Sequence, residues 1–205
     1  MVVMSRQTGR SPVAWWGLMS SAAAPVLLMG GWTIAAARQR DSFDPVVETI
    51  SALAAYGADD RWVMSTALAG LGICHLTTAA ALRGAAPVGR AILAGGGVAT
   101  VLVAVFPLPA DESGSGAHTV VAGTAFLALA VWPALASRRD MSNVAGPLRP
   151  VASVAAAAVL LGLVGWFAAE LASDGDRVGL TERVAAGAQS LWPLVAVWGS
   201  RRWRR

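Results

Sequence analysis

The stretch VAWWGLMSSAAAPVLLMGGWTIAAA, residues 13–37, decides the fold because it runs for 25 residues without a charged side chain. A bilayer core about 30 Å thick needs roughly 20 predominantly apolar residues for one helical crossing. Further along the chain, five more apolar stretches follow, and nearly every charged residue lies in the short segments between them. We therefore expect six transmembrane spans, at about residues 13–37, 62–82, 91–109, 118–136, 151–172 and 184–198.

The composition indicates the same class of protein. Of the 205 residues, 56% are hydrophobic and only 14% are charged, which leaves too little polar surface for a soluble globule. Backbone groups inside a bilayer must be satisfied within their own segment, so spans of this length must be helices. We predict an all-α polytopic membrane bundle that forms a single domain over residues 1–205. The net charge of +4 comes from arginines at the span ends, so no nucleic-acid partner is expected.

Arginine is distributed unevenly between the two sides of the predicted bundle. Eleven of the sixteen lie in the terminal segments and the loops of one side. The positive-inside rule places that side, and with it both termini, in the cytoplasm. The use of Arg without any Lys favours a GC-rich bacterial source, so we expect a multi-pass protein of the bacterial inner membrane. The five arginines of the opposite, outer side are Arg38, Arg40, Arg61, Arg177 and Arg183.

The segment between the first two spans is long and has a periodicity of its own. Apolar residues recur at helical spacing from Phe43 to Ala54, and Asp44-Pro45 supplies a cap and a first-turn proline. We therefore predict a short amphipathic helix over residues 45–55, lying in the outer interface. Its second stripe carries Glu48 and Ser51.

Polar residues gather at the outer ends of the predicted spans, where three adjacent helix ends can converge. Glu182 and Arg183 open the sixth span, His118 opens the fourth and Glu170 lies near the end of the fifth. Such a group can bind a lipid head group or another polar solute, although charges also collect at helix ends because water begins there. The residues of this predicted polar cup are Glu48, Ser51, Asp111, Glu112, His118, Glu170, Glu182 and Arg183.

The two histidines do not predict a metal or haem site. His75 lies 13 residues into the second span, about 20 Å below the outer face at 1.5 Å per residue, whereas His118 lies at that face. Zinc needs about four ligands around one point, and a bis-histidine haem needs both rings at one iron. We expect no metal and no cofactor. His75 is expected to form a hydrogen bond between helices, with Thr77 or Thr78 as candidate neighbours.

Small residues recur one helical turn apart in the second and third spans, at Gly70, Gly72, Cys74 and residues 95–99. Small residues let helices in a membrane approach closely. We expect these faces to pack within the chain, and a homodimer through them is the alternative.

Four motifs resemble the DUF998 family of bacterial and archaeal membrane proteins. They are Ile50-Ser51-Ala52-Leu53-Ala54-Ala55, then Phe106-Pro107, then Gly116-Ala117-His118, and finally Gly179-Leu180-Thr181-Glu182-Arg183 ahead of Leu191-Trp192. The resemblance covers most of the chain and implies the six-span architecture. Family members often have an acid where this chain has Ala52, and another soon after the Phe-Pro pair, so no acidic role is carried over. The family's function is unknown, and the resemblance implies no chemistry.

Three functions are consistent with these features. A binding or accessory protein for envelope lipids or their head groups is favoured, with membrane lipid as the partner. A membrane enzyme acting on lipid head groups, with His118 as base or metal ligand, is an alternative, but His118 is the only obvious proton carrier that the sequence offers at the outer face. A small-solute transporter is a further alternative, disfavoured because ion-coupled carriers usually hold ionisable groups in mid-span.

Overall fold

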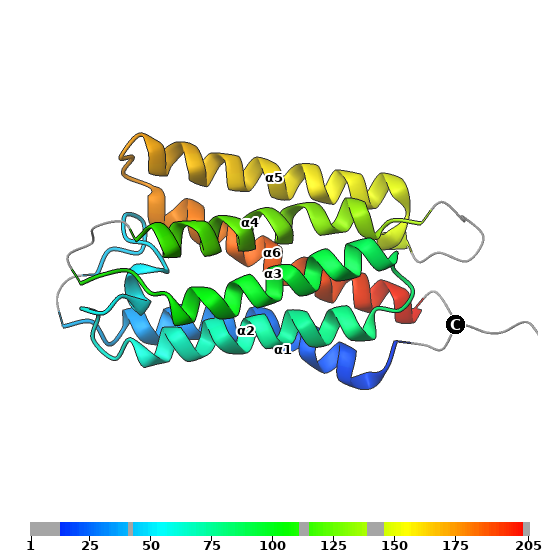
Figure 1. Ribbon diagram of the computed structural model, residues 1–205, viewed down its shortest axis with the longest axis horizontal. Helices are drawn as coiled ribbons and strands as arrows, with labels where there is room; N and C mark the ends of the chain where they lie inside the picture. The colour runs from blue at the N-terminus through cyan, green and yellow to red at the C-terminus, as the bar shows by residue number, and fades with distance from the viewer. Residues whose placement is uncertain (1–12, 41–42, 111–114, 139–145, 203–205) are drawn as a thin grey trace, which may run out of the picture.

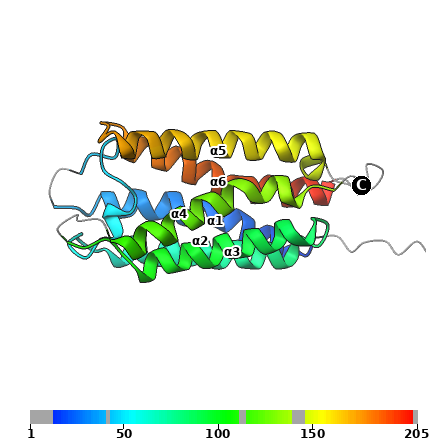
Figure 2. The same cartoon turned by 45° about the horizontal axis from the view of Figure 1, so that its top comes forward.

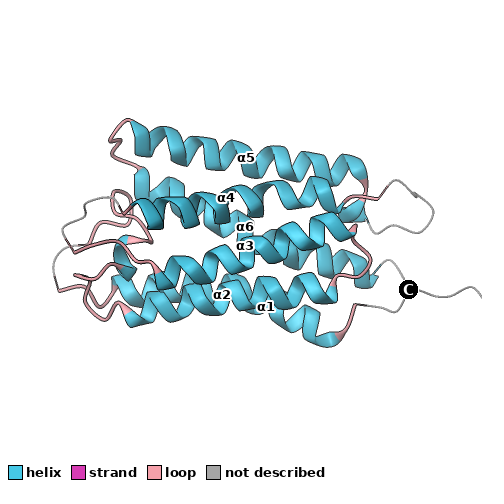
Figure 3. Ribbon diagram, viewed as in Figure 1, coloured by secondary structure: helices cyan, strands magenta, loops and turns pink. Residues whose placement is uncertain are grey.

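The computed structural model describes residues 13–40, 43–110, 115–138 and 146–202. Within those residues the chain forms six α-helices and no strand, which confirms the all-α helical bundle (Figure 3). The helices are α1 (Trp15–Ala36), α2 (Trp62–Ala81), α3 (Pro87–Val105), α4 (Gly116–Ala136), α5 (Pro150–Ala172) and α6 (Val178–Arg202). Two short 3₁₀ turns, η1 (Ala52–Ala54) and η2 (Gly146–Leu148), lie in the connections.

The helices run up and down in chain order and close into a ring. Each helix packs against the next one along the chain, and α6 returns to pack against α1 (Figures 1 and 2). Helix α5 lies at the edge of the bundle, with Ser153, Ala157 and Leu160 as its buried residues. This arrangement leaves an interior space that α1, α2, α3, α4 and α6 surround.

Five helices, α1 to α5, are long and apolar enough to cross a membrane. The chain is therefore a multi-pass membrane protein. Helix α6 is more polar, because it carries the buried side chains of Glu182, Gln189 and Ser190 on its inward face. The ring shields these side chains from the surroundings of the bundle.

Some predicted span ends differ from the helices. The third span was predicted at residues 91–109, but α3 begins at Pro87, where proline fits the first turn, and ends at Val105. Phe106 leaves the helical conformation because it precedes Pro107. Helix α6 begins at Val178, six residues before the predicted span, and its additional turns carry Glu182 and Arg183.

The close contact between α2 and α3 depends on glycine. A Cβ on Gly97 would lie 2.8 Å from the Gly72 carbonyl oxygen and 3.1 Å from the His75 Cβ. A Cβ on Gly72 would lie 2.9 Å from the Val101 backbone nitrogen. These glycines therefore pack against a neighbouring helix of the same chain, as expected. Gly95 has open space around it, and the homodimer alternative stays a prediction.

Charged side chains divide the bundle into two ends. The described acidic residues, from Asp44 to Glu182, lie at the end formed by residues 37–61, 106–110 and 173–177, which we call the acidic end. The opposite end, which we call the arginine end, includes the first and last described residues, and Arg201 Nη1 donates to the Val13 carbonyl at 2.9 Å. The described arginines of this end are Arg83, Arg90, Arg138, Arg149, Arg201 and Arg202.

The predicted interfacial helix over residues 45–55 is wrong. Residues 45–51 form turns and a bend, and only Ala52–Ala54 is helical. A helix would direct the Ile50 N–H to the Val46 carbonyl. Instead, the Val46 carbonyl accepts from Leu180 N at 2.9 Å, and the Ile50 N–H donates to Glu182. For these two groups, bonds to a distant helix replace the bond that a local helix would make.

Candidate functional site

Residues 44–51 are fastened to the first turns of α6, and we call this junction the clasp. The N–H of Gly179 donates to the Val47 carbonyl at 3.1 Å, and that of Leu180 donates to the Val46 carbonyl at 2.9 Å. The first N–H groups of a helix have no partner within the helix, so the loop satisfies them. A Cβ on Gly179 would collide with Glu48 and lie 2.8 Å from the Pro45 carbonyl oxygen, so only glycine fits this approach.

Glu182 is the buried charge-bearing group of the clasp. Its carboxylate accepts the Ile50 N–H and, at 3.2 Å, the Ser51 hydroxyl, and the residue is 4% exposed. Glu182 lies before residues 184–198, the predicted membrane-crossing part of α6. Burial raises the pKa of this carboxyl to about 7, although the Ile50 N–H, the nearby Arg183 charge and the Ser51 hydroxyl act in the opposite direction.

Arg183 binds the same loop through main-chain carbonyls. Its Nη1 donates to the carbonyls of Pro45 at 2.8 Å, Glu48 at 2.7 Å and Gly179 at 2.9 Å. The guanidinium also lies 5.5 Å from the centre of the Phe43 ring, within cation–π range. Arg183 thus bonds to main-chain carbonyls, which explains how turns without regular structure keep a defined shape.

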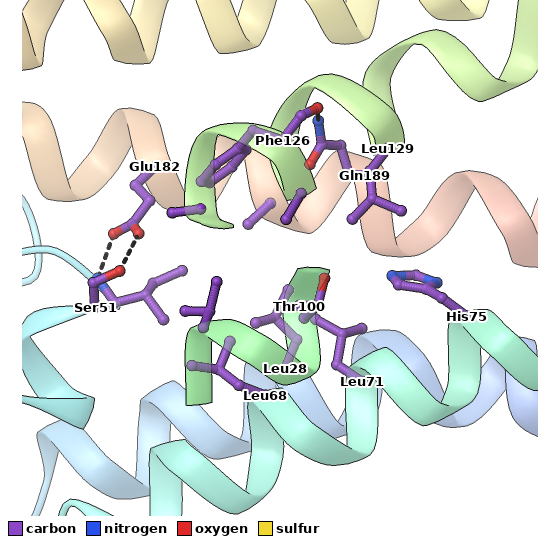
Figure 4. A pocket seen from close by; sticks show the side chains of 15 residues that line it. Leu28, Ser51, Leu68, Leu71, His75, Thr100, Phe126, Leu129, Glu182 and Gln189 are labelled. Carbon is purple, nitrogen blue, oxygen red and sulfur yellow. Dashed lines mark hydrogen bonds between the residues drawn. The ribbon is translucent and has the colours of Figure 1, made fainter. Parts of the chain in front are cut away.

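An interior cavity begins beneath the clasp and extends toward the arginine end (Figure 4). Its volume is about 60 Å³, and one side of it is open. Most of the wall is apolar. The lining residues are Leu28, Ile50, Ser51, Leu68, Leu71, His75, Thr100, Val103, Ala122, Ala125, Phe126, Leu129, Glu182, Ala186 and Gln189.

Three polar side chains line the cavity away from the clasp. Thr100 Oγ1 donates to the Gly96 carbonyl at 2.8 Å, and Gln189 Nε2 donates to the Phe126 carbonyl at 2.8 Å. The third is His75, which is 0% exposed, and neither of its ring nitrogens has a hydrogen-bond partner among the described residues.

The predicted hydrogen bond from His75 to Thr77 or Thr78 is therefore wrong. Thr77 Oγ1 donates to the Ile73 carbonyl of its own helix at 2.8 Å. The Thr78 hydroxyl lies 3.0 Å from that of Ser20 on α1, so Thr78 makes the contact between helices. His75 lies on the face of α2 that looks into the ring, and its imidazole points toward the cavity (Figure 4).

A second, larger depression lies at the acidic end, and we call it the basin. It has a volume of about 620 Å³, and its wall combines acidic, amide, hydroxyl and apolar side chains. Residues 47–53 separate it from the interior cavity, because Ile50 and Ser51 line the cavity and their neighbours line the basin. The lining residues are Gln39, Phe43, Val47, Glu48, Thr49, Ala52, Leu53, Ala55, Gly57, Ala58, Asp59, Leu108, Pro109, Ala110, Leu171 and Asp174.

The structure brings part of the predicted polar cup together. Ser51, Glu182 and Arg183 meet at the clasp, and Glu48 lies beside them in the wall of the basin. Asp111 and Glu112 lie outside the described residues. Glu170, near the end of α5, lines neither the basin nor the cavity, and its carbonyl accepts the Gly175 N–H at 2.9 Å.

His118 is also separate from the clasp. It is 7% exposed, and its Nδ1 lies 2.8 Å from the Phe106 carbonyl, so it ties the start of α4 to the end of α3. It lines neither the cavity nor the basin. In the part of the chain that the structure describes, no three His, Cys, Asp or Glu side chains gather as a metal site.

Sequence reasoning missed Gln189 and Thr100 as parts of the cavity wall. Gln189 is the only Asn or Gln within the six predicted spans, which is the signal that points to it. Polar side chains inside a span usually face the interior of the bundle. Thr100 has no comparable signal, because a threonine can satisfy its hydroxyl within its own helix, as Thr100 does.

Comparisons with known proteins give one match. A family model with the description "Protein of unknown function (DUF998)" matches residues 21–199. That range includes both sides of the clasp and the lining of the cavity and of the basin. No curated protein and no solved structure matches the chain.

Proposed function

The chain belongs to the DUF998 family, whose function is unknown, and we propose that it binds the polar head group of a membrane lipid at the acidic end of the bundle. In this role it is an accessory or binding protein of the cell envelope. We further propose that it resides in a bacterial inner membrane with both termini in the cytoplasm, so that the acidic end faces outward. The excess of arginine at the opposite end supports this orientation.

The basin is the observation that carries the proposal. Its volume of about 620 Å³ suits a head group, and it lies where the membrane-crossing helices end. Phe43, Val47 and Leu171 supply apolar wall, whereas Glu48 and Asp174 supply carboxylates. A wall of mixed character fits a molecule with a polar end and an apolar body.

The charges of the basin favour a head group that donates hydrogen bonds. Asp59 already pairs with Arg40 at 3.3 Å, but Glu48 and Asp174 have no ion-pair partner among the described residues. An ammonium group is attracted to such carboxylates, whereas a second anionic group is repelled. Arg40, whose side chain is 86% exposed, lies beside the basin and can approach the phosphate. An ethanolamine lipid combines both groups.

The geometry supports head-group binding better than the two alternatives. Catalysis by His118 is not favoured, because its ring is nearly buried and bonded to the Phe106 carbonyl. Transport is not favoured, because the fully buried side chains of Leu82, Leu93 and Trp132 fill the bundle toward the arginine end. Head-group binding in the basin requires neither a catalytic side chain nor a path through the bundle.

Native mass spectrometry of the purified chain tests the proposal. The protein is incubated in mild detergent with equal amounts of phosphatidylethanolamine and phosphatidylglycerol that carry the same acyl chains. We expect the ethanolamine lipid to dominate the retained adducts. Removing the charge-assisted bonds with Glu48→Gln and Asp174→Asn together should lower this preference by about tenfold or more.

Asp176→Asn is the matched control, because Asp176 is a nearby exposed carboxylate that does not line the basin. It should leave the preference unchanged. Equal retention of both lipids by the unmodified chain would refute head-group selection. An equal effect of Asp176→Asn would show that the general charge of the acidic end, and not the basin, attracts the lipid.

A further inference from the structure

We propose that the interior cavity is a second binding site, which holds an uncharged apolar molecule through a hydroxyl group at His75. This site is distinct from the basin and does not rest on head-group binding. Residues 47–53 lie between the two spaces.

The state of His75 points to a ligand. The residue is fully buried, its imidazole faces the cavity, and both ring nitrogens lack a partner among the described residues (Figure 4). Buried polar atoms without a partner are rare in folded proteins, because their lost hydration is not replaced. An uncharged imidazole has one N–H donor and one acceptor nitrogen. A hydroxyl both donates and accepts, so it can satisfy either nitrogen.

Close packing of α2 and α3 leaves little room on one side of His75. A Cβ added to Gly97 would lie 3.1 Å from the His75 Cβ, so the backbone of α3 occupies the space beside this atom. The imidazole points to the cavity and makes no hydrogen bond to a described residue (Figure 4).

The rest of the cavity wall favours a ligand that is apolar and uncharged apart from its hydroxyl group. Leu71, Phe126 and Leu129 line the cavity, and burying a charge against such side chains is costly. At the other end, the Glu182 carboxylate already accepts two hydrogen bonds from the clasp. A ligand with its own carboxylate would bring a charge into this largely apolar space, which disfavours fatty acids.

The length of the cavity suits a ligand with a short hydrocarbon chain. On α6, the cavity wall extends from Glu182 to Gln189, and seven residues of helix span about 10 Å. On α2, the lining residues Leu68 and His75 are also seven residues apart. Buried side chains of the arginine half, including Trp132, close the space beyond His75. A lipid alcohol or a similar molecule about 10 Å long therefore fits with its hydroxyl at the closed end.

Photolabelling with an octanol that carries a diazirine tests this site. The full chain in mild detergent is irradiated with this probe or with the matching diazirine octane, and labelled residues are mapped by mass spectrometry. Labelling is normalised to Val159, which is 62% exposed on the outward face of α5. We expect the octanol probe to label Leu71 and Phe126 about fivefold more than the octane probe, the ratio for one net hydrogen bond of about 1 kcal/mol.

Three variants define the site further. His75→Leu should reduce octanol labelling of the cavity to the octane level, because it removes the polar ring and keeps an apolar side chain. Ala125→Phe should block both probes by filling the cavity, and Ala158→Leu, at an exposed position on α5, should change neither.

Two results would overturn the proposal. If the cavity holds only water, neither probe will label it, and 60 Å³ has room for several waters. Equal cavity labelling by the two probes would show that the hydroxyl is not recognised. Both results come from the unmodified chain, so they stand even where a variant fails to fold.

Discussion

Replacing Gly179 with alanine sets two effects on stability against each other. Gly179 lies in the second residue position of α6, and alanine is about 1 kcal/mol better than glycine inside a helix. Helix propensity alone therefore predicts stabilisation. The clasp predicts the opposite, because the new Cβ would lie 2.7 Å from the Glu48 carbonyl carbon and 2.8 Å from the Pro45 carbonyl oxygen.

The magnitude follows from the bonds that must break. Both clashing groups are backbone atoms, so the loop has to move away from α6 as a unit. That movement removes the bonds from Gly179 N and Leu180 N to the loop carbonyls, each worth about 1 kcal/mol, and strains those from Arg183. Losing two to four such bonds against the gain in propensity leaves a net destabilisation of about 1–3 kcal/mol.

Unfolding in mild detergent, followed by tryptophan fluorescence, measures this change. Gly165→Ala on α5 is the matched control, because a Cβ at Gly165 meets nothing within 4 Å. The control should be neutral or slightly stabilising. Proteolysis of the folded protein should also cut residues 44–51 faster in Gly179→Ala. If both variants are equally stable and equally resistant, the bonds of the clasp do not hold residues 44–51 against α6.

Three further predictions concern other parts of the molecule. His118→Ala should lower the melting temperature in detergent more than His75→Leu does, because only His118 makes a hydrogen bond that is lost, to the Phe106 carbonyl; the reverse order would contradict this reading. The pKa of Glu182 lies at about 7 in the folded protein, above its ordinary value of 4.5, so its stabilising contribution is complete below about pH 4.5 and is lost as the pH rises through 7. The melting temperature of the unmodified chain should therefore fall between pH 5 and pH 8 relative to Glu182→Gln, and parallel profiles would refute the shift. A cysteine introduced at Ser115, in a Cys74→Ala background, should react with an impermeant reagent in intact spheroplasts; reaction only after lysis would reverse the proposed orientation.

The candidate site could be predicted from the sequence only in part. Polar residues at span ends indicated the neighbourhood of Glu48, Ser51, Glu182 and Arg183, because charges must lie where water begins. The sequence predicts Ser51 on one stripe of an amphipathic helix over residues 45–55, and the structure contains no such helix. The grouping arises instead from the Ser51 hydroxyl and the Ile50 N–H, which bond to a carboxylate more than 130 residues away.

For His75, the sequence predicts its position along the helix but not its hydrogen-bonding partner. Its depth in the membrane could be read from its position in the second apolar stretch, since helix rise per residue is fixed. Its lack of a partner could not be read, because Thr78 is equally available by sequence but faces Ser20 on α1. Which neighbour a buried polar group finds depends on how the helices are rotated in the ring.

The sequence by itself determined the helices and the membrane class, because the length of an uncharged apolar stretch and the need to satisfy backbone groups in lipid are local properties. It also determined the uneven placement of arginine and the small residues at which α2 and α3 approach. Only the tertiary structure decided that the loop before α2 would serve as the cap of α6, that His75 would face an open space, and that residues 47–53 would separate that space from the basin. Each of these depends on hydrogen bonds and packing between segments far apart in the chain, which no local pattern encodes.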